Sequence, residues 1–282
     1  MMNNLYDFFN YRSVYYRSAL WALACMTILG NVCSLLGRLY MSGGKLTGSF
    51  HVFICNLCLA DALMGVYLII IGAADYTYSG VYIFHDQQWK HSGWCKFAGF
   101  LSVLSSEVSA FTICLITHDR YLVVKFPFSK SNYNRTSTFV SCALLWCFAI
   151  LLAAIPTLPA TTHWEYYSQT GVCVPLPFTT GENFKGYMFV FSIMIMLNFV
   201  VFACIASGQI AIYLTIRESA MEGSSKDSAS RDHVIARRLT TVVISDFLCW
   251  FPVCFLGALA AVGKYSETWK RRPLFALNTG SL

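Results

Sequence analysis

Charged side chains are scarce in this chain. Asp, Glu, Lys and Arg together make up 12% of its 282 residues, whereas hydrophobic residues make up 56%. Soluble domains carry a charge at about 25% of their positions. The scarcity therefore excludes an ordinary soluble domain and indicates a protein whose main solvent is lipid.

The motifs of zinc proteins, membrane proteases and channels are also missing. Paired Cys and His residues do not recur at zinc-binding spacing. No H-E-x-x-H sequence occurs, and the only candidate acid pair, Asp61 and Asp246, does not lie in protease-like motifs. A voltage-gated channel would need regularly spaced arginines in one helix and a filter between the last two spans, where this chain has the polar stretch EGSSKDSAS. We therefore expect no enzyme activity and no cofactor.

A cleavable signal peptide is absent as well. The first 13 residues, MMNNLYDFFNYRS, are polar and aromatic, so we expect the first apolar segment to act as the insertion signal. Crossing a bilayer takes about 20 helical residues. Runs of that kind lie at roughly 14–40, 49–74, 95–124, 137–158, 185–216 and 234–262. The sequence predicts an all-α membrane protein, a transmembrane helical bundle with six spans over residues 14–262.

The basic residues predict the orientation of this bundle. Short loops rich in Lys and Arg stay in the cytoplasm. The first, third and fifth connections hold Arg38, Lys45, Lys125, Lys130, Arg135, Arg217, Lys226, Arg231, Arg237 and Arg238. The second and fourth connections hold only Lys90, Lys96 and Lys185. Residues 1–13 are thus expected to be an extracellular tail, and the net charge of +6 gives no reason to expect nucleic acid binding.

Two of the twelve cysteines and two acids stand apart from the rest. Cys95 opens the third span and Cys173 lies in the second outer loop, where an oxidising compartment favours a disulfide between them. The alternative is a pair of free thiols. Asp61 and Asp246 stand deep in the second and sixth spans, where a charge is costly and is a functional candidate. The alternative for each acid is a hydrogen bond that only joins neighbouring helices.

Several short motifs are in register along the chain. They are Gly30-Asn31 in the first span, Asn56, Leu57 and Asp61 in the second, Trp89 and Cys95 at the third, Asp119-Arg120-Tyr121 at its end, Trp146 in the fourth, and Cys249-Trp250-Phe251-Pro252 in the sixth. Together they resemble the rhodopsin-like (class A) G-protein-coupled receptors. The segments NLCLADALMGVYL, LSSEVSAFTICL, RYLVVKFPFS and SDFLCWFP, with the acid at Asp246, resemble the leucine-rich-repeat-containing branch, nearest to the relaxin and glycoprotein hormone receptors.

The resemblance implies roles for the residues around Arg120. In this family the arginine is held at rest by its acidic neighbour, here Asp119, and by an acid at the base of the sixth helix, here Asp232. Movement of the helices then releases it to contact a heterotrimeric G protein. A guanidinium suits this exchange because it makes bidentate bonds to carboxylates. The resemblance also implies a role in G-protein coupling for three residues that follow Arg120, namely Tyr121, Phe126 and Pro127.

A second set of implied roles lies within the membrane. Pro252 removes a helical hydrogen bond and is the expected pivot of the sixth helix, with Trp250 above it. Asn31, Ser109 and Asp246 are expected to complete, with Asp61, an intramembrane polar switch. No metal site is expected, and the alternative is an incomplete sodium site formed by Asp61 and Ser109. Binding of an extracellular peptide or protein hormone, and contact with membrane lipid, follow from the same resemblance.

The chain departs from the family at its end. After Val262 it reads GKYSETWKRRPLFALNTGSL, without a seventh span or an Asn-Pro pair, and residues 263–282 are expected to be an atypical, disordered tail. The leading hypothesis is a multi-pass plasma membrane receptor with an extracellular N-terminus. The alternative is a truncated form that does not signal, is retained in the endoplasmic reticulum or modulates a full-length receptor as a heteromer.

Overall fold

The computed structural model describes residues 2–41, 48–126, 134–164, 166–168, 170–175 and 186–221. These residues form the helices α1 (Met2–Met41), α2 (Ser49–Thr77), α3 (Tyr82–Lys90), α4 (Gly93–Lys125), α5 (Arg135–Ala154), η1 (Ile155–Thr157), η2 (Pro159–Trp164), α6 (Tyr187–Phe191), η3 (Ser192–Leu197) and α7 (Asn198–Met221). No β-strand occurs in this described part of the chain. The predicted all-α fold is confirmed.

Five stretches are long and apolar enough to cross a membrane. They are Arg17–Tyr40, Ser49–Thr77, Gly93–Lys125, Thr136–Thr157 and Phe189–Glu218. Helices are expected here because lipid offers no hydrogen-bond partner to the backbone, and a helix satisfies its own N–H and C=O groups. The five stretches agree with the first five predicted spans. The predicted sixth span, 234–262, lies outside the described residues.

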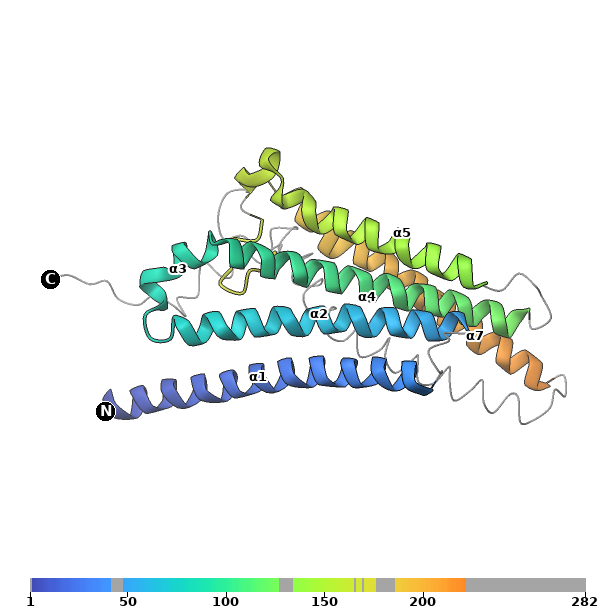
Figure 1. Ribbon diagram of the computed structural model, residues 1–282, viewed down its shortest axis with the longest axis horizontal. Helices are drawn as coiled ribbons and strands as arrows, with labels where there is room; N and C mark the ends of the chain where they lie inside the picture. The colour runs from blue at the N-terminus through green and yellow to red at the C-terminus, as the bar shows by residue number, and fades with distance from the viewer. Residues whose placement is uncertain are drawn as a thin grey trace.

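Helix α4 is the centre of the bundle (Figure 1). It packs along α2 on one side and against α5 and α7 on the other, while α1 packs along α2. Most of the α4 span is buried, whereas almost none of the α1 span is. A displacement of α4 would therefore change its packing against α2, α5 and α7 together.

Two side-chain caps fix where α4 and α5 begin. The Ser92 hydroxyl accepts a hydrogen bond from the backbone N–H of Cys95 at 3.1 Å, and the Asn134 side-chain oxygen accepts one from Ser137 N–H at 2.7 Å. Such caps satisfy N–H groups that the first helical turn leaves without partners. The Ser92 cap thereby sets the position of Cys95.

Helices α6, η3 and α7 follow one another without a break. The η3 turn is a π-helix, wider than the α-helix on either side of it. Asn198 begins α7, and its side-chain amide donates to the Ile193 carbonyl of the wide turn at 3.0 Å. The π-helical turn therefore turns Asn198 toward the interior of the bundle, where its side chain is buried.

Candidate functional site

Helix α4 carries predicted functional residues near both of its ends. Cys95 lies in its first turn and Arg120 lies five residues before its last residue, Lys125. The structure therefore separates a disulfide end, which contains Cys95 and α3, from an Arg120 end, which contains the start of α2. The polar residues of the predicted intramembrane switch lie between the two ends.

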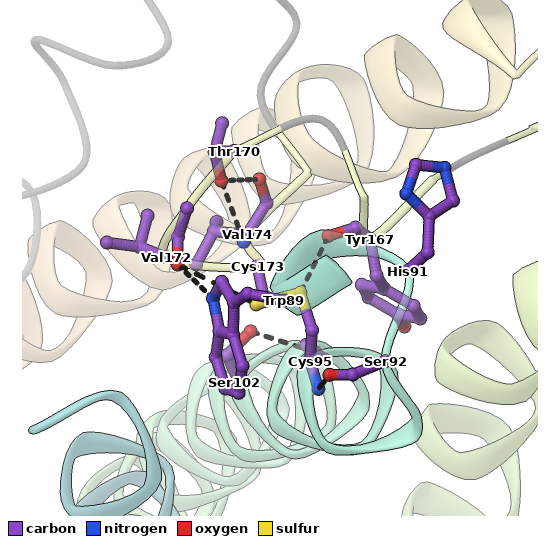
Figure 2. Close-up of a disulfide and its surroundings, with 12 residues drawn as sticks. Trp89, His91, Ser92, Cys95, Ser102, Tyr167, Thr170, Val172, Cys173 and Val174 are labelled. Carbon is purple, nitrogen blue, oxygen red and sulfur yellow. Dashed lines mark hydrogen bonds between the residues drawn. A yellow bond between two sulfur atoms is a disulfide. The ribbon is translucent and has the colours of Figure 1, made fainter. Parts of the chain in front are cut away.

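The predicted disulfide is confirmed. Cys95 is bonded to Cys173 of the loop between α5 and α6, with their Cα atoms 5.4 Å apart (Figure 2). Cys173 has a φ of 57°, in the left-handed region that residues other than glycine adopt infrequently. Its backbone N–H donates to the Thr170 carbonyl at 3.0 Å. The bonded cysteine and this tight turn tie the loop to the first turn of α4.

Three aromatic side chains hold the same loop in place. Trp89 of α3 donates its indole N–H to the Gly171 carbonyl at 2.8 Å, beside the disulfide in Figure 2. The Tyr67 hydroxyl donates to the Val172 carbonyl at 2.9 Å, and the Tyr167 hydroxyl donates to the Ala153 carbonyl at 2.8 Å. Each bond satisfies a backbone carbonyl, so the shape of the loop does not depend on the covalent bond alone.

A glycine on α4 allows this loop to approach so closely. A Cβ atom at Gly99 would collide with the ring of Tyr167 and with the backbone carbonyl of Cys173. The carbonyl belongs to the disulfide-bonded residue and cannot move aside freely. Close packing of the loop on α4 therefore requires glycine at this position.

A cavity of 560 Å³ opens at the disulfide end between α1, α2, α3 and this loop. Its wall is largely apolar and aromatic, with Tyr67, Ile71 and Trp89, and its polar groups include Asp86 and Lys90. Burial by itself would raise the pKa of Asp86, but hydrogen bonds from Lys90 and Tyr82 and the charge of Lys90 outweigh it and lower that pKa. The cavity has the mixed lining that ligand sites commonly show.

Between the ends, the structure brings Asp61 and Ser109 together. The Ser109 hydroxyl donates to the Asp61 carboxylate at 2.7 Å, across the contact between α2 and α4. Asn31 instead donates its amide to the Thr27 carbonyl one turn earlier in α1, at 2.8 Å. Asp61 and Ser109 supply two of the six or more oxygen ligands that a hard cation takes. These two side chains are consistent with the sodium site but do not complete it. The sodium site therefore stays a prediction.

A buried acid in the middle of α4 was missed in the sequence. Glu107 of α4 is 1% exposed, and one of its carboxylate oxygens accepts a hydrogen bond from the Asn198 amide of α7 at 3.1 Å. Its other oxygen and the buried Tyr166 hydroxyl have no hydrogen-bond partner among the described residues. Burial, together with the charge of Glu107, raises the pKa of Tyr166. The rule that marked Asp61, an acid within an apolar span, would have marked Glu107 too.

An amide on α2 joins three helices. The Trp146 indole of α5 donates to the Asn56 side-chain oxygen at 2.6 Å, and the Asn56 amide donates to the Thr112 hydroxyl of α4 at 2.7 Å. The sequence marked Asn56 and Trp146 as motif residues, and the structure shows them bonded to each other. The two hydrogen bonds hold α4 and α5 to α2.

At the Arg120 end, Arg120 and Asp119 form an ion pair. A terminal guanidinium nitrogen of Arg120 lies 2.7 Å from one Asp119 oxygen. Asp119 is 1% exposed, and its other oxygen accepts a hydrogen bond from the Ser49 hydroxyl of α2 at 2.7 Å. The predicted contact is therefore present, and its role as a latch stays a prediction.

The remaining residues predicted at this end are only partly described. Tyr121 is half-buried, and the Lys125 ammonium lies 5.9 Å from the centre of its ring. Phe126 follows the last residue of α4 and is half-exposed. Pro127, Asp232, Asp246, Trp250 and Pro252 lie outside the described residues. Over the part of the chain that is described, no group of three or more His, Cys, Asp or Glu side chains could hold a metal ion.

Comparison with known proteins places this geometry in a family. Residues 31–277 match the model of the seven-transmembrane receptors of the rhodopsin family. The chain is 35% identical over 253 residues to the G-protein coupled receptor GRL101 of Lymnaea stagnalis, covering 89% of the chain and 22% of that protein. It is 31% identical to relaxin receptor 2 of Homo sapiens over 86% of the chain and 32% of the receptor.

A third relative belongs to the hormone receptors of the same branch. The lutropin-choriogonadotropic hormone receptor of Gallus gallus is 30% identical over 247 residues, which cover 87% of the chain and 32% of that receptor. The chain thus spans only 22% to 32% of the length of these curated relatives.

Proposed function

Because the chain belongs to the rhodopsin family of seven-transmembrane receptors, in the branch of the relaxin and glycoprotein hormone receptors, we propose that it relays hormone binding to a heterotrimeric G protein. The hormone is a peptide or protein that acts from outside the cell. The relay is a movement of helices, and it requires neither a cofactor nor a catalytic group.

The observation that carries this proposal is the Asp119–Arg120 ion pair. It lies in the last two turns of the central helix, at the end opposite the disulfide-bonded Cys95, and the half-exposed Phe126 follows that helix. A guanidinium held by a neighbouring carboxylate can exchange that bond for contacts with a partner once the helices separate. Asp232 is the proposed second acid of the resting pair, and Tyr121, Phe126 and Pro127 are the proposed neighbouring contacts of the G protein.

The disulfide and the basic residues support the proposed orientation. Disulfides persist in oxidising compartments, so the disulfide end is the extracellular end. Lys and Arg are concentrated in the connections at the Arg120 end, and such loops remain in the cytoplasm. The hormone thus acts at the end that holds the 560 Å³ cavity, and the G protein binds at the other.

The signal between the ends passes along α4. This helix holds the polar pairs Asp61–Ser109 and Glu107–Asn198, which bond it to α2 and α7. In low dielectric such bonds have few alternative arrangements, so they suit a bundle with two discrete states. Asp246 and Trp250 on the sixth span, with Pro252 as pivot, are the proposed moving counterpart.

Nucleotide exchange on a purified G protein tests the proposal. The full-length protein in lipid nanodiscs is mixed with each of the main classes of heterotrimeric G protein, and guanine nucleotide exchange is measured. We expect exchange with at least one class and at least a tenfold loss in Arg120→Ala. The matched control is Arg17→Ala, which removes an arginine that pairs with Asp75 at the disulfide end and should keep exchange.

A protein that catalyses no exchange with any class contradicts the proposal. A receptor that is inactive without its hormone would also give no exchange. The Asp119→Asn variant tests this case, because it removes the charge that holds Arg120 and should activate the receptor without hormone. If that variant is also inactive while correctly inserted, G-protein coupling is not its function.

A further inference from the structure

We propose that the first turn of α2 is the second half of the latch, with Ser49 and Phe50 as the residues that hold the Asp119–Arg120 pair in its resting geometry. This inference rests on the proposed G-protein coupling. It adds two positioning residues from a different helix, neither of which the sequence singled out. Their removal should favour the released state of Arg120.

Ser49 fixes the orientation of the Asp119 carboxylate. The two oxygens of Asp119 are bound from different helices: one accepts from the Ser49 hydroxyl of α2 and the other accepts from Arg120 of α4, each at 2.7 Å. A carboxylate that is 1% exposed has little water to replace a lost donor. The Ser49 bond therefore holds one oxygen of Asp119 in place and aims the other at Arg120.

Phe50 acts on the guanidinium itself. The central carbon of the Arg120 guanidinium lies 4.4 Å from the centre of the Phe50 ring, within the range of a cation–π contact. The Arg120 side chain is only 19% exposed, and its buried Nε has no hydrogen-bond partner among the described residues. The face of the ring thus replaces part of the hydration that the cation has lost.

Phe50 is held by the side chains packed around it. Phe50 packs against a buried cluster that includes Val52 and Phe53 of α2, Ile116 of α4 and Cys142 of α5. Ser49 and Phe50 are consecutive and open α2, so Ser49 contacts the anion of the pair while Phe50 contacts the cation. Any shift of α4 along α2 at this end strains the two contacts together.

Fluorination of the Phe50 ring separates its electrostatic role from its shape. Difluoro-, trifluoro- and pentafluorophenylalanine placed at position 50 withdraw electron density from the ring face and change its size little. We expect G-protein signalling without hormone, measured per receptor at the cell surface, to rise stepwise with fluorine number. The full series should span roughly two- to thirty-fold, the range that a cation–π contact allows.

Substitutions extend the test to Ser49. Ser49→Ala and Phe50→Leu should each raise hormone-independent signalling, and the double variant should exceed either one. The matched controls are exposed residues of α7. Ser207→Ala removes a hydroxyl that donates to the Cys204 carbonyl of its own helix, and Phe199→Leu changes an exposed phenylalanine. Both controls should leave signalling unchanged.

Asp119→Asn distinguishes the possible failures. If it raises signalling while the fluorinated series and Ser49→Ala stay at the unmodified level, the inference is wrong and the proposed function survives. If neither Asp119→Asn nor any other variant alters a G-protein signal, the proposed function is wrong and the inference fails with it. The fluorinated receptors test the role of Phe50 even if Phe50→Leu fails to reach the surface.

Discussion

The two ends of α4 are held by different kinds of bond. At the disulfide end a covalent bond joins Cys95 to Cys173, and the indole of Trp89 and two tyrosines bind backbone carbonyls of the neighbouring segments. At the Arg120 end the contacts involve side chains: the ion pair, the Ser49 hydroxyl and the Phe50 ring. One end is fixed to the backbone of a loop, whereas the other depends on groups that can exchange partners.

This difference suits a helix that transmits a displacement. A helix fixed at one end and reversibly held at the other responds to a push by moving at the weaker end, because local stability varies along a structure. Substitutions at the disulfide end should therefore lower the stability of the protein. Substitutions at the Arg120 end should alter signalling more than stability.

Removal of the disulfide is expected to have the largest effect. The bond closes a loop of 78 residues, and loss of such a bond typically costs about 2–4 kcal/mol. The double variant Cys95→Ala/Cys173→Ala should melt at a clearly lower temperature in detergent and reach the cell surface less often. Its matched control is Cys204→Ala, an exposed free cysteine on α7. Equal melting of the double variant and the control would contradict the assigned role of the disulfide.

A methyl group at Gly99 should have the next largest effect. Gly99→Ala forces apart α4 and the loop, since the Cys173 carbonyl and the Tyr167 ring occupy the space of the new atom. Overpacking of this kind costs about 1–3 kcal/mol. The control Gly37→Ala, on α1, meets no atom within 4 Å and should stabilise its helix by about 0.5–1 kcal/mol. Melting temperatures of the two variants should shift in opposite directions.

The sequence predicted what depends on local pattern. Long apolar runs revealed the five described spans, because composition alone decides whether a segment can cross lipid. Cys95 and Cys173 could be paired from the side of the membrane on which their segments lie. Asp61 was recognised because a charge in an apolar run is conspicuous, and Glu107 could have been recognised for the same reason.

What the sequence did not predict depends on tertiary contacts. Ser49 and Phe50 are ordinary residues at the start of a helix, and nothing local indicates that this start lies against Asp119 and Arg120, 70 residues later. The π-helical turn before Asn198 contains no proline or glycine from which an irregular turn could have been predicted. Helix α3 is too short for apolar periodicity to reveal it, and its Trp89 makes sense only beside Gly171.

Removing one threonine hydroxyl at each end of α4 compares how the two ends affect signalling. The Thr117 hydroxyl accepts from the Gln209 amide of α7 at 3.2 Å, near the Arg120 end, and the Thr170 hydroxyl accepts from the backbone N–H of Val174 at the disulfide end. Thr→Val keeps the shape and should cost about 0.5–1.5 kcal/mol at either site. We expect a few-fold rise in hormone-independent signalling for Thr117→Val and none for Thr170→Val. Equal signalling from both variants would remove the distinction between the ends.

The smallest effect should come from the partly buried ion pair within α3. Lys90 and Asp86 lie 2.8 Å apart at helical spacing, and such pairs contribute about 0.3–0.5 kcal/mol. The pKa of Asp86 is lower in the folded protein than in the unfolded chain, so folding favours the ionised carboxylate. The stability that the ion pair contributes is therefore fully present above the unfolded pKa of about 3.9. It is lost as the pH falls through the still lower pKa of the folded protein.

A cycle of Asp86→Asn, Lys90→Met and the double variant isolates this small term. The coupling between the two substitutions should be measurable in melting temperatures at pH 7 and should vanish in acid once Asp86 is protonated. Hormone-independent signalling should not change in any variant, since the pair lies at the fixed end of the bundle. A coupling that persists in acid would show that packing of the two side chains, and not their charges, joins them. A change in signalling would show that the disulfide end also affects the proposed latch.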